Sequence, residues 1–305
     1  MRMRGLTDFD RPQTTSIVES AAHNFKVPIR DLRPRVLLQL HRPSFLEVAS
    51  SKEVIRVAEN EASLLRSAVD ELEQKYEKPR SPVSISELRI RFLSPEDAHL
   101  IFGRIHYLRR VPPGARCLAG VHPATGLPVV AIAYEDSRWR SVRRALRGSF
   151  GIPQVKVIDV SRVHTLESSP KGAVSWILSR LLGSLRRLKM PEAILSTAVD
   201  STLGFQGISY RAAGWRHAVT VEPRPYTYVD GIYASAGYLK FHYGTADIAQ
   251  LCKLLGSRFS YSDPSLRGDT LIFARTTEKG NRPPLKVSAI TRRWVKPDLV
   301  NGGQR

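Results

Sequence analysis

Hydrophobic residues follow a helical period before residue 80 and a mixture of strand and helix periods after it. Between Ser51 and Tyr76 the apolar residues recur every three or four positions, which predicts one amphipathic helix with an acidic opposite face. Residues 1–45 show no sustained period and predict loops and short helices. Two prolines in residues 78–82 exclude a continuous helix. We therefore predict a helical accessory region over residues 1–80, in which the 51–76 helix could also form a homodimer contact.

Strand and helix patterns alternate after residue 82. Short Val- and Ile-rich runs predict strands, and the strongest helix pattern begins directly after Gly172. The predicted strands are 83–92, 115–121, 128–134, 154–163, 193–199, 218–221 and 226–241, and the other predicted helices are 94–107 and 205–214. This order predicts an α/β fold over residues 83–245, a mixed central sheet flanked by helices, followed by a small C-terminal extension over residues 246–305.

The charge of the chain is concentrated in this second part. The sequence has 47 Lys and Arg against 28 Asp and Glu, a formal charge of +19, and +17 of it lies after residue 80. Such an excess indicates a polyanionic partner, most commonly nucleic acid. A predicted helix in the most basic stretch would gather guanidinium groups, which suit phosphate oxygens, although a solvated basic face is the alternative. The arginines of this stretch are Arg138, Arg140, Arg143, Arg144 and Arg147.

Several classes of protein are not expected from the composition. There is no run of about eighteen apolar residues, and the basic start at Met1 is not followed by an apolar segment, so we expect a cytoplasmic protein with no membrane partner. Two cysteines are too few for a disulfide framework or a Cys-rich zinc site. The eight histidines have no His-x-x-x-His spacing, so no metal site is predicted from the residues.

Polar residues at the ends of predicted strands are the main candidates for chemistry. Asp200 ends one apolar strand and is followed by Gly204, Gly207 and a short helix that contains Tyr210. Clefts form at the carboxyl edge of open α/β sheets, and Arg162 ends the preceding strand, so Arg162 and Asp200 could meet there. The alternative is that Asp200 caps the turn and Tyr210 packs in the core.

Two further features could belong to such a cleft. Residues 168–172 open the long helix, where backbone amides beside Lys171 could hold a phosphate, although the same stretch is typical of an ordinary helix entry. His106 ends the first helix of the domain and could serve as a base or a ligand, although a lone histidine is more often neither.

Taken together, these motifs resemble the Mom family of phage DNA-modifying proteins. The resemblance rests on His106-Tyr107, Arg162 and the run Asp200…Gly204…Gly207…Tyr210-Arg-Ala-Ala-Gly-Trp215. It implies a GNAT-like acyltransferase fold and an enzyme that alters the exocyclic amine of adenine in DNA, which shields phage genomes from restriction in the infected bacterial cell. It also implies a functional core made of Arg162, Asp200 and Tyr210, to which we add His106 as a further catalytic candidate.

The resemblance extends to cofactor and substrate. A GNAT fold implies acetyl-CoA or another acyl-CoA donor, and the residues in the matching place are Val163, Ser169, Lys171, Gly172 and Ala173, although the usual Gln/Arg-x-x-Gly-x-Gly loop is absent. Iron is implied by some members of the family. The substrate would be double-stranded DNA with a flipped base, held by the arginines of residues 138–147, with Trp215 or Tyr107 stacking on the base.

Within this resemblance each core residue has an expected role. Asp200 would orient or deprotonate the amine, Tyr210 would donate a proton or hydrogen bond, and Arg162 would hold a carboxylate or the carbonyl of the donor. The DruA-like proteins of bacterial anti-phage systems share the His106-Tyr107-Leu108 motif and the Tyr210–Trp215 run, so a DNA-binding defence subunit is an alternative. An acyltransferase acting on RNA or protein is another.

Overall fold

The computed structural model describes residues 12–46, 50–77, 79, 81–187, 192–277 and 287–291. The N-terminal part is helical: α1 (Pro12–Asn24), α2 (Ile29–Leu40), α3 (Pro43–Leu46) and α4 (Ser51–Lys75). The predicted long helix is thus present, but Ser50 rather than Ser51 is its N-cap, in a capping box with Glu53. α1 and α2 are regular helices of three turns, where the sequence indicated loops and short helices.

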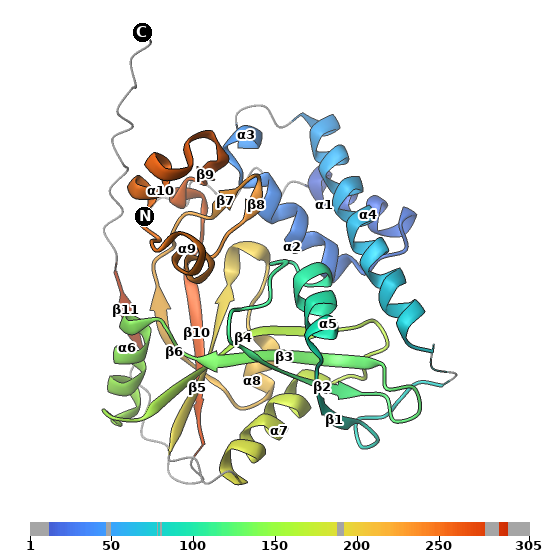
Figure 1. The fold of residues 1–305 in the computed structure, drawn as a ribbon, viewed down its shortest axis with the longest axis vertical. Coiled ribbons are helices and arrows are strands. Elements are labelled where there is room, and N and C mark those ends of the chain that lie inside the picture. Colours follow the sequence, from blue (N-terminus) through green and yellow to red (C-terminus); the bar gives the residue numbers. More distant parts are fainter. Residues whose placement is uncertain are drawn as a thin grey trace.

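The rest of the chain is built on one mixed sheet (Figure 1), whose described strands lie in the order β1-β2-β3-β4-β5-β10-β6-β11. Pairs β4–β5 and β6–β11 are parallel and the others are antiparallel. The strands are β1 (Arg89–Phe92), β2 (Arg116–Val121), β3 (Pro128–Asp136), β4 (Lys156–Thr165), β5 (Ala193–Asp200), β6 (Arg216–Val221), β10 (Thr270–Thr276) and β11 (Ser288–Ile290). The predicted fold class, an α/β fold with a mixed central sheet flanked by helices, is confirmed.

One strand of the main sheet, β10, lies outside residues 83–245, the range that we predicted for the α/β fold. β10 was placed in a C-terminal extension, but it lies between β5 and β6 and pairs with both. Its alternating apolar residues Ile272 and Ala274 face α6, and Phe273 enters the core on the opposite side. Both faces of β10 are therefore buried, as expected for a central strand.

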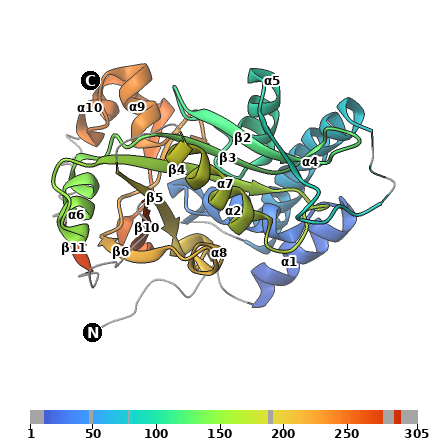
Figure 2. The ribbon, with the colours of Figure 1, turned by 90° about the horizontal axis from the view of Figure 1, so that it is seen from below.

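Helices cover both faces of the sheet. α7 (Ala173–Arg187) buries the apolar stripe predicted for it, including Ile177, Leu181 and Leu185, against one face. α6 (Arg140–Phe150) packs on the other face beside β6 and β11, and Figures 1 and 2 both place it at the opposite end of the molecule from α1 and α4. The remaining helices of this part are α5 (Pro95–Ala98), the π-helix η1 (His99–Ile105), the 3₁₀ turn η2 (Ser201–Leu203) and α8 (Ile208–Ala212).

A small second sheet, in the order β8-β7-β9, lies beyond the end of β5. Its elements are β7 (Thr227–Val229), β8 (Ile232–Tyr233), α9 (Ala236–Tyr243), α10 (Ile248–Leu255), η3 (Gly256–Arg258), β9 (Phe259–Tyr261) and η4 (Pro264–Leu266). The predicted strand 226–241 is therefore wrong in its second half. Ser235 accepts a hydrogen bond from the Tyr238 amide and begins α9, and Gly244 ends it in the left-handed conformation.

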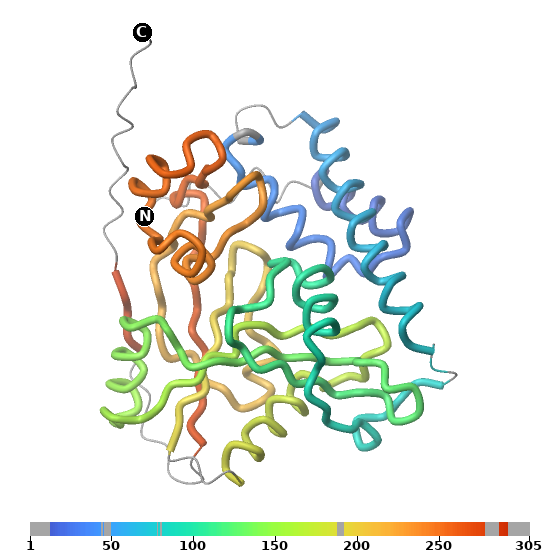
Figure 3. The backbone as a smooth tube through the Cα atoms, viewed as in Figure 1, coloured from blue at the N-terminus to red at the C-terminus, as the bar shows by residue number. Residues whose placement is uncertain are grey.

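The N-terminal helices pack directly on this body. The apolar stripe of α4, for example Ala58, Ala62 and Leu65, is fully buried against α1, α2 and η1 of the same chain. These residues of the stripe are therefore used within the chain, and a homodimer contact through the rest of the 51–76 helix stays a prediction. Figure 3 shows α2 between α4 and the small sheet, where the Tyr228 hydroxyl donates to the Leu38 carbonyl at 2.7 Å.

Candidate functional site

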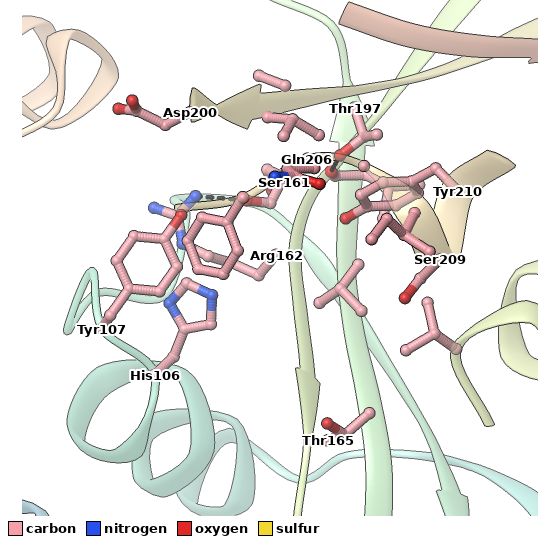
Figure 4. A pocket seen from close by; sticks show the side chains of 18 of the residues that line it. His106, Tyr107, Ser161, Arg162, Thr165, Thr197, Asp200, Gln206, Ser209 and Tyr210 are labelled. Carbon is pink, nitrogen blue, oxygen red and sulfur yellow. Dashed lines mark hydrogen bonds between the residues drawn. The ribbon is translucent and has the colours of Figure 1, made fainter. Parts of the chain in front are cut away.

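A cavity of about 370 Å³ opens where β4 and β5 separate. The two strands pair only over residues 156–159 and 193–196, and both continue beyond their last pair. The cavity is lined by the diverging ends of both strands, by the 204–210 turn and by His106 and Tyr107 (Figure 4). Its volume lies in the range of sites that take small molecules. Arg162, Asp200, Tyr210 and His106, the predicted catalytic residues, all line it.

A β-bulge in β4 aims Arg162 into this space. On β3, Ala133 pairs with Arg162 and the next residue pairs with Val160, so Ser161 is an extra residue in the ladder. The bulge reverses the alternation of side chains along β4. Val160 and Val163 therefore both pack toward the α7 core, and Arg162 turns to the opposite face with Asp159.

Arg162 is a cation with few partners. Its Nη1 donates to the Ser161 carbonyl at 2.5 Å, while its buried Nε has no hydrogen-bond partner among the described residues. Burial lowers the pKa of Arg162, and the nearby Tyr107, Tyr233 and Asp159 oppose this shift. A buried donor left unpaired costs free energy, so the arrangement suits a ligand oxygen that would accept from it.

Asp200 is held by a different arginine from the one the sequence indicated. Its Oδ2 accepts from Arg267 Nη2 at 2.6 Å and from the Tyr226 hydroxyl at 2.7 Å, and its Oδ1 accepts from the Thr202 amide at 3.1 Å. Asp200 and Arg162 both line the cavity, as the sequence predicted they could, but the described residues show no ion pair between them. Arg267 comes from the loop before β10, which the fold brings beside the end of β5.

The Arg267 guanidinium is almost entirely removed from solvent. Its side chain is 8% exposed, and its Cζ lies 3.7 Å above the Tyr226 ring. Burial and the adjacent Asp200 raise the pKa of the Tyr226 hydroxyl well above its usual value, so Tyr226 donates rather than ionises. His41, at the end of α2, meets the same ring edge-on at 5.3 Å. The carboxylate is thus oriented by groups from three distant segments.

Tyr210 lies across the cavity from Arg162 (Figure 4). Its ring stacks on Phe273, with centroids 6.2 Å apart, and Gly207 permits this packing because a Cβ there would collide with the Phe273 ring. Burial raises the pKa of Tyr210 to about 12. The hydroxyl is therefore neutral at ordinary pH and can donate a proton or a hydrogen bond.

His106 and Tyr107 form the wall of the cavity next to Arg162 (Figure 4). His106 Nδ1 accepts from the Leu108 amide at 3.2 Å, so the neutral ring carries its proton on Nε2. Burial, followed by the charge of Arg162, lowers the pKa of His106 well below its usual value. The ring is thus a neutral donor, which argues against the expected role as a base. Tyr107 packs on Phe205 with centroids 5.2 Å apart.

The residues expected to hold an acyl-CoA donor are only partly brought to the cavity. Val163 lines it, and so does Val174 in the first turn of α7. Ser169, Lys171, Gly172 and Ala173 do not line it, although they form the entry to that turn. Gly172 has a φ of +86°, and the Ser169 hydroxyl oxygen is buried without a partner among the described residues.

The predicted DNA-binding residues lie away from the cavity. The basic stretch is a helix, as predicted, and Arg138, Arg140 and Arg144 are exposed, but none of its arginines lines the cavity. Arg147 donates to the Val155 carbonyl at 2.9 Å, and Arg143 is half-buried. Val142 and Leu146 of the same helix are buried against the sheet.

Trp215 does not lie where a flipped base could reach it. It is 3% exposed and belongs to the core beneath α7, so the expected stacking on a base is corrected. β6 begins at the next residue, and the Trp215 ring packs in the core rather than at the surface. Tyr107, the other ring expected to stack on a base, does line the cavity.

Metal-binding clusters and membrane-spanning helices are both missing from the described part of the chain. Its residues contain no cluster of three or more His, Cys, Asp or Glu side chains that could hold a metal ion. These residues therefore do not fit the iron that the resemblance implied. In the described portion, no helix has both the length and the apolar character needed to cross a bilayer.

Sequence reasoning missed several residues of the site. Tyr226 and Arg267 carried no visible motif, and the one available signal was that Tyr226 opens an aromatic-rich segment. Thr197 donates to the Val160 carbonyl at 2.9 Å where the strands part. Asp159, on the same strand as Arg162, does not line the cavity; burial, followed by the charge of Glu135, raises its pKa to about 6.

One family model agrees with the motifs. Residues 87–243, just over half of the chain, match the model of the Mom protein family. The yncA protein of Salmonella typhimurium with its cofactor acetyl-CoA is 12% identical, with a TM-score of 0.34 over 65% of this chain and 98% of that one. NAA60 of Arabidopsis thaliana in complex with acetyl-CoA is 10% identical, with a TM-score of 0.37 over 62% of this chain and 98% of that one. No curated protein matches the chain.

Proposed function

The chain belongs to the Mom protein family, and from that premise we propose that it is a GNAT-like transferase that modifies the exocyclic amine of adenine in DNA. In a cell infected by a phage, such a modification would protect phage DNA from restriction. The proposal concerns the cavity between β4 and β5, where the family motifs meet.

One observation carries the proposal: three separated motifs converge on that cavity with complementary chemistry. Arg162 and His106 offer hydrogen-bond donors, Asp200 offers a fixed carboxylate, and Tyr210 offers a neutral hydroxyl from the opposite wall. Group transfer to a weakly nucleophilic amine needs an acceptor for the amine, donors for the developing oxyanion and an acid for the leaving group. The cavity supplies each of these.

Each residue has a role in the proposed transfer. Asp200, which Arg267 and Tyr226 fix, orients the amine and takes its proton as the new N–C bond forms. Arg162 and the Nε2–H of His106 donate to the carbonyl oxygen, where negative charge develops. Tyr210 donates to the departing atom, since its raised pKa keeps it protonated.

An acyl-CoA fits the remaining features of the cavity. Val163 and Val174 would flank its pantetheine arm, and the entry to α7 at Lys171 and Gly172 would face its phosphates. Bound there, the cofactor would supply a thioester whose acyl group is transferred. The orphan Ser169 hydroxyl lies in this entry and could donate to a phosphate oxygen.

The proposal is tested by nucleoside mass spectrometry of DNA from cells that produce the protein. Wild type should leave a new modified nucleoside, and Asp200→Asn and Tyr210→Phe should abolish or strongly reduce it while remaining folded. Arg56→Gln, an exposed change on α4, is the control and should leave the yield unchanged. If wild type leaves no new nucleoside in host DNA or in DNA of a matched phage, the proposal is wrong.

A second experiment, transfer of label from acetyl-CoA to different acceptors, separates the alternatives. A DruA-like DNA-binding subunit would bind duplex DNA without altering it. An acyltransferase acting on RNA or protein would transfer label from acyl-CoA to tRNA or to a polypeptide, but not to duplex DNA. Incubating the purified protein with labelled acetyl-CoA and each acceptor distinguishes these outcomes.

A further inference from the structure

A buried group of charges joins the N-terminal helices to the wall of the cavity. Arg35 of α2 and Glu61 of α4 lie beside Arg109, which follows the His106-Tyr107-Leu108 motif by one residue. The side chains of Arg35 and Glu61 are 0% and 3% exposed, and that of Arg109 is 20% exposed. We call Arg35, Glu61 and Arg109 the buried triad.

The upstream flank of the motif is attached to Arg35. η1 ends at Ile105, and the carbonyl oxygens at the end of a helix lack partners within the helix. Arg35 Nη2 donates to the Ile105 carbonyl at 3.1 Å and also to the Arg104 carbonyl. A single guanidinium thus binds the last two carbonyls before His106. π-helical turns such as η1 are rare and are frequently found at functional sites.

The downstream flank is attached to Glu61. Arg109 has a φ of +46°, an uncommon value for a residue with a side chain, and its amide bonds the His106 carbonyl at 2.9 Å in a tight turn. Its guanidinium pairs with Glu61 Oε1, while Glu61 Oε2 lies 3.6 Å from Arg35 Nη1. The motif is therefore held at both ends by one carboxylate and two cations.

Burying these three charged side chains costs free energy. Burial and the like charge of Arg109 lower the pKa of Arg35 to about 10, and its Nε and Nη1 have no hydrogen-bond partner among the described residues. Apolar residues of similar volume often stabilise a fold as well as a buried ion group does, so the triad is not needed for stability alone. What it supplies beyond packing is a fixed position for the chain that carries His106 and Tyr107.

We infer that the buried triad is a positioning device, by which α2 and α4 hold the His106-Tyr107 wall of the cavity in register with Arg162. The inference rests on the proposed function for its catalytic consequence. Arg35 and Glu61 lie outside residues 87–243, the range that matches the family model. The N-terminal helices would therefore contribute to a site whose other residues lie within the matched range.

The test replaces the triad by apolar residues of similar size, Arg35→Met, Glu61→Leu and Arg109→Met together. We expect a folded protein whose kcat for transfer to DNA is at least tenfold lower and whose KM for acetyl-CoA is unchanged. Arg66→Met is the matched control, because Arg66 pairs with Asp70 and Glu73 on the outer face of the same helix α4 and should alter none of these values.

A readout independent of transfer keeps this inference separate from the proposed function. Nitrogen NMR of the His106 ring should show a single Nε2–H tautomer in wild type and a mixture of tautomers in the triple variant. If wild type transfers nothing to DNA, the proposed function fails, but the ring signals still decide the positioning role. Retention of both the tautomer and a kcat within twofold of wild type would overturn the inference.

Two milder variants test the inference if the triple variant does not fold. Arg109→Met releases only the downstream flank and leaves Arg35 with Glu61 as a neutral pair, so it should fold and show an intermediate loss of kcat. Arg35→Lys keeps the charge but cannot donate to two carbonyls from one planar group. The His106 ring signals of this variant should therefore differ from those of wild type. Wild-type signals and kcat in both would overturn the inference.

Discussion

Arginine occurs in two contrasting places in this protein, the cavity between β4 and β5 and the surface of α6. Arg162 is turned into the cavity by a β-bulge and keeps an unpartnered Nε among the described residues, whereas Arg140 and Arg144 are exposed. A cation in water costs little, but a buried donor without a partner costs free energy that the fold must offset. The difference indicates that the α6 arginines can serve affinity for a polyanion, while Arg162 is prepared for a specific ligand atom.

The largest effect should come from removing the charge of the cavity. Arg162→Met removes the cation and its donors beside the developing oxyanion, and loss of one such donor typically lowers kcat about 10²- to 10³-fold. Steady-state transfer to duplex DNA measures it, with a melting curve to confirm folding. A loss smaller than fivefold would place the chemistry elsewhere.

The buried carboxyl group of Asp159, on the same strand as Arg162, should make the stability of the protein depend on pH. The pKa of Asp159 is about 6 in the folded protein, above its usual value of 3.8, so the folded state binds its proton more tightly than the unfolded state. Its contribution to stability is full below about pH 4 and is lost as the pH rises through 6, by at most about 3 kcal/mol. Urea denaturation between pH 4 and 7 should show this slope in wild type, and Asp159→Asn should flatten it.

Weakening the hydrogen bonds that hold Asp200 should lower kcat to a smaller extent. Tyr226→Phe removes a hydrogen bond to a carboxylate, which is worth about 2 kcal/mol, and leaves the Arg267 pair in place. We expect a kcat about tenfold lower with little change in the KM for the donor. Tyr261→Phe on the small sheet is the control, and an equal loss there would show that the effect is not specific to these hydrogen bonds.

The smallest effect should come from α6, and it should be seen in affinity alone. Replacing Arg140 and Arg144 with Gln should reduce the dependence of log Kd on log salt by about 0.9 for each DNA phosphate that α6 no longer neutralises, without altering kcat at saturating DNA. Lys52→Gln with Arg56→Gln makes the same charge change on α4. Equal slopes for the two double variants would show that α6 does not bind the DNA backbone.

Local pattern was a good guide wherever an element is specified by its own residues. The strongly periodic helix after Gly172, the hairpin of β2 and β3, and the basic helix α6 were all predicted from spacing and turn residues. The second half of 226–241 was not, because its apolar residues suit either a strand or a helix and the cap at Ser235 decided between them. Motif order also placed Arg162, Asp200 and Tyr210 on the elements that carry them.

The sequence by itself determined the mixed sheet, the distribution of charge and three of the residues that meet at the cavity, because these depend on local periodicity and on motif order. Only the tertiary structure decided their partners. Asp200 pairs with Arg267, Trp215 is buried, and the buried residues of the 51–76 helix pack against α1, α2 and η1. Each of these contacts joins segments far apart in sequence, and the period of a single segment carries no information about what will lie against it.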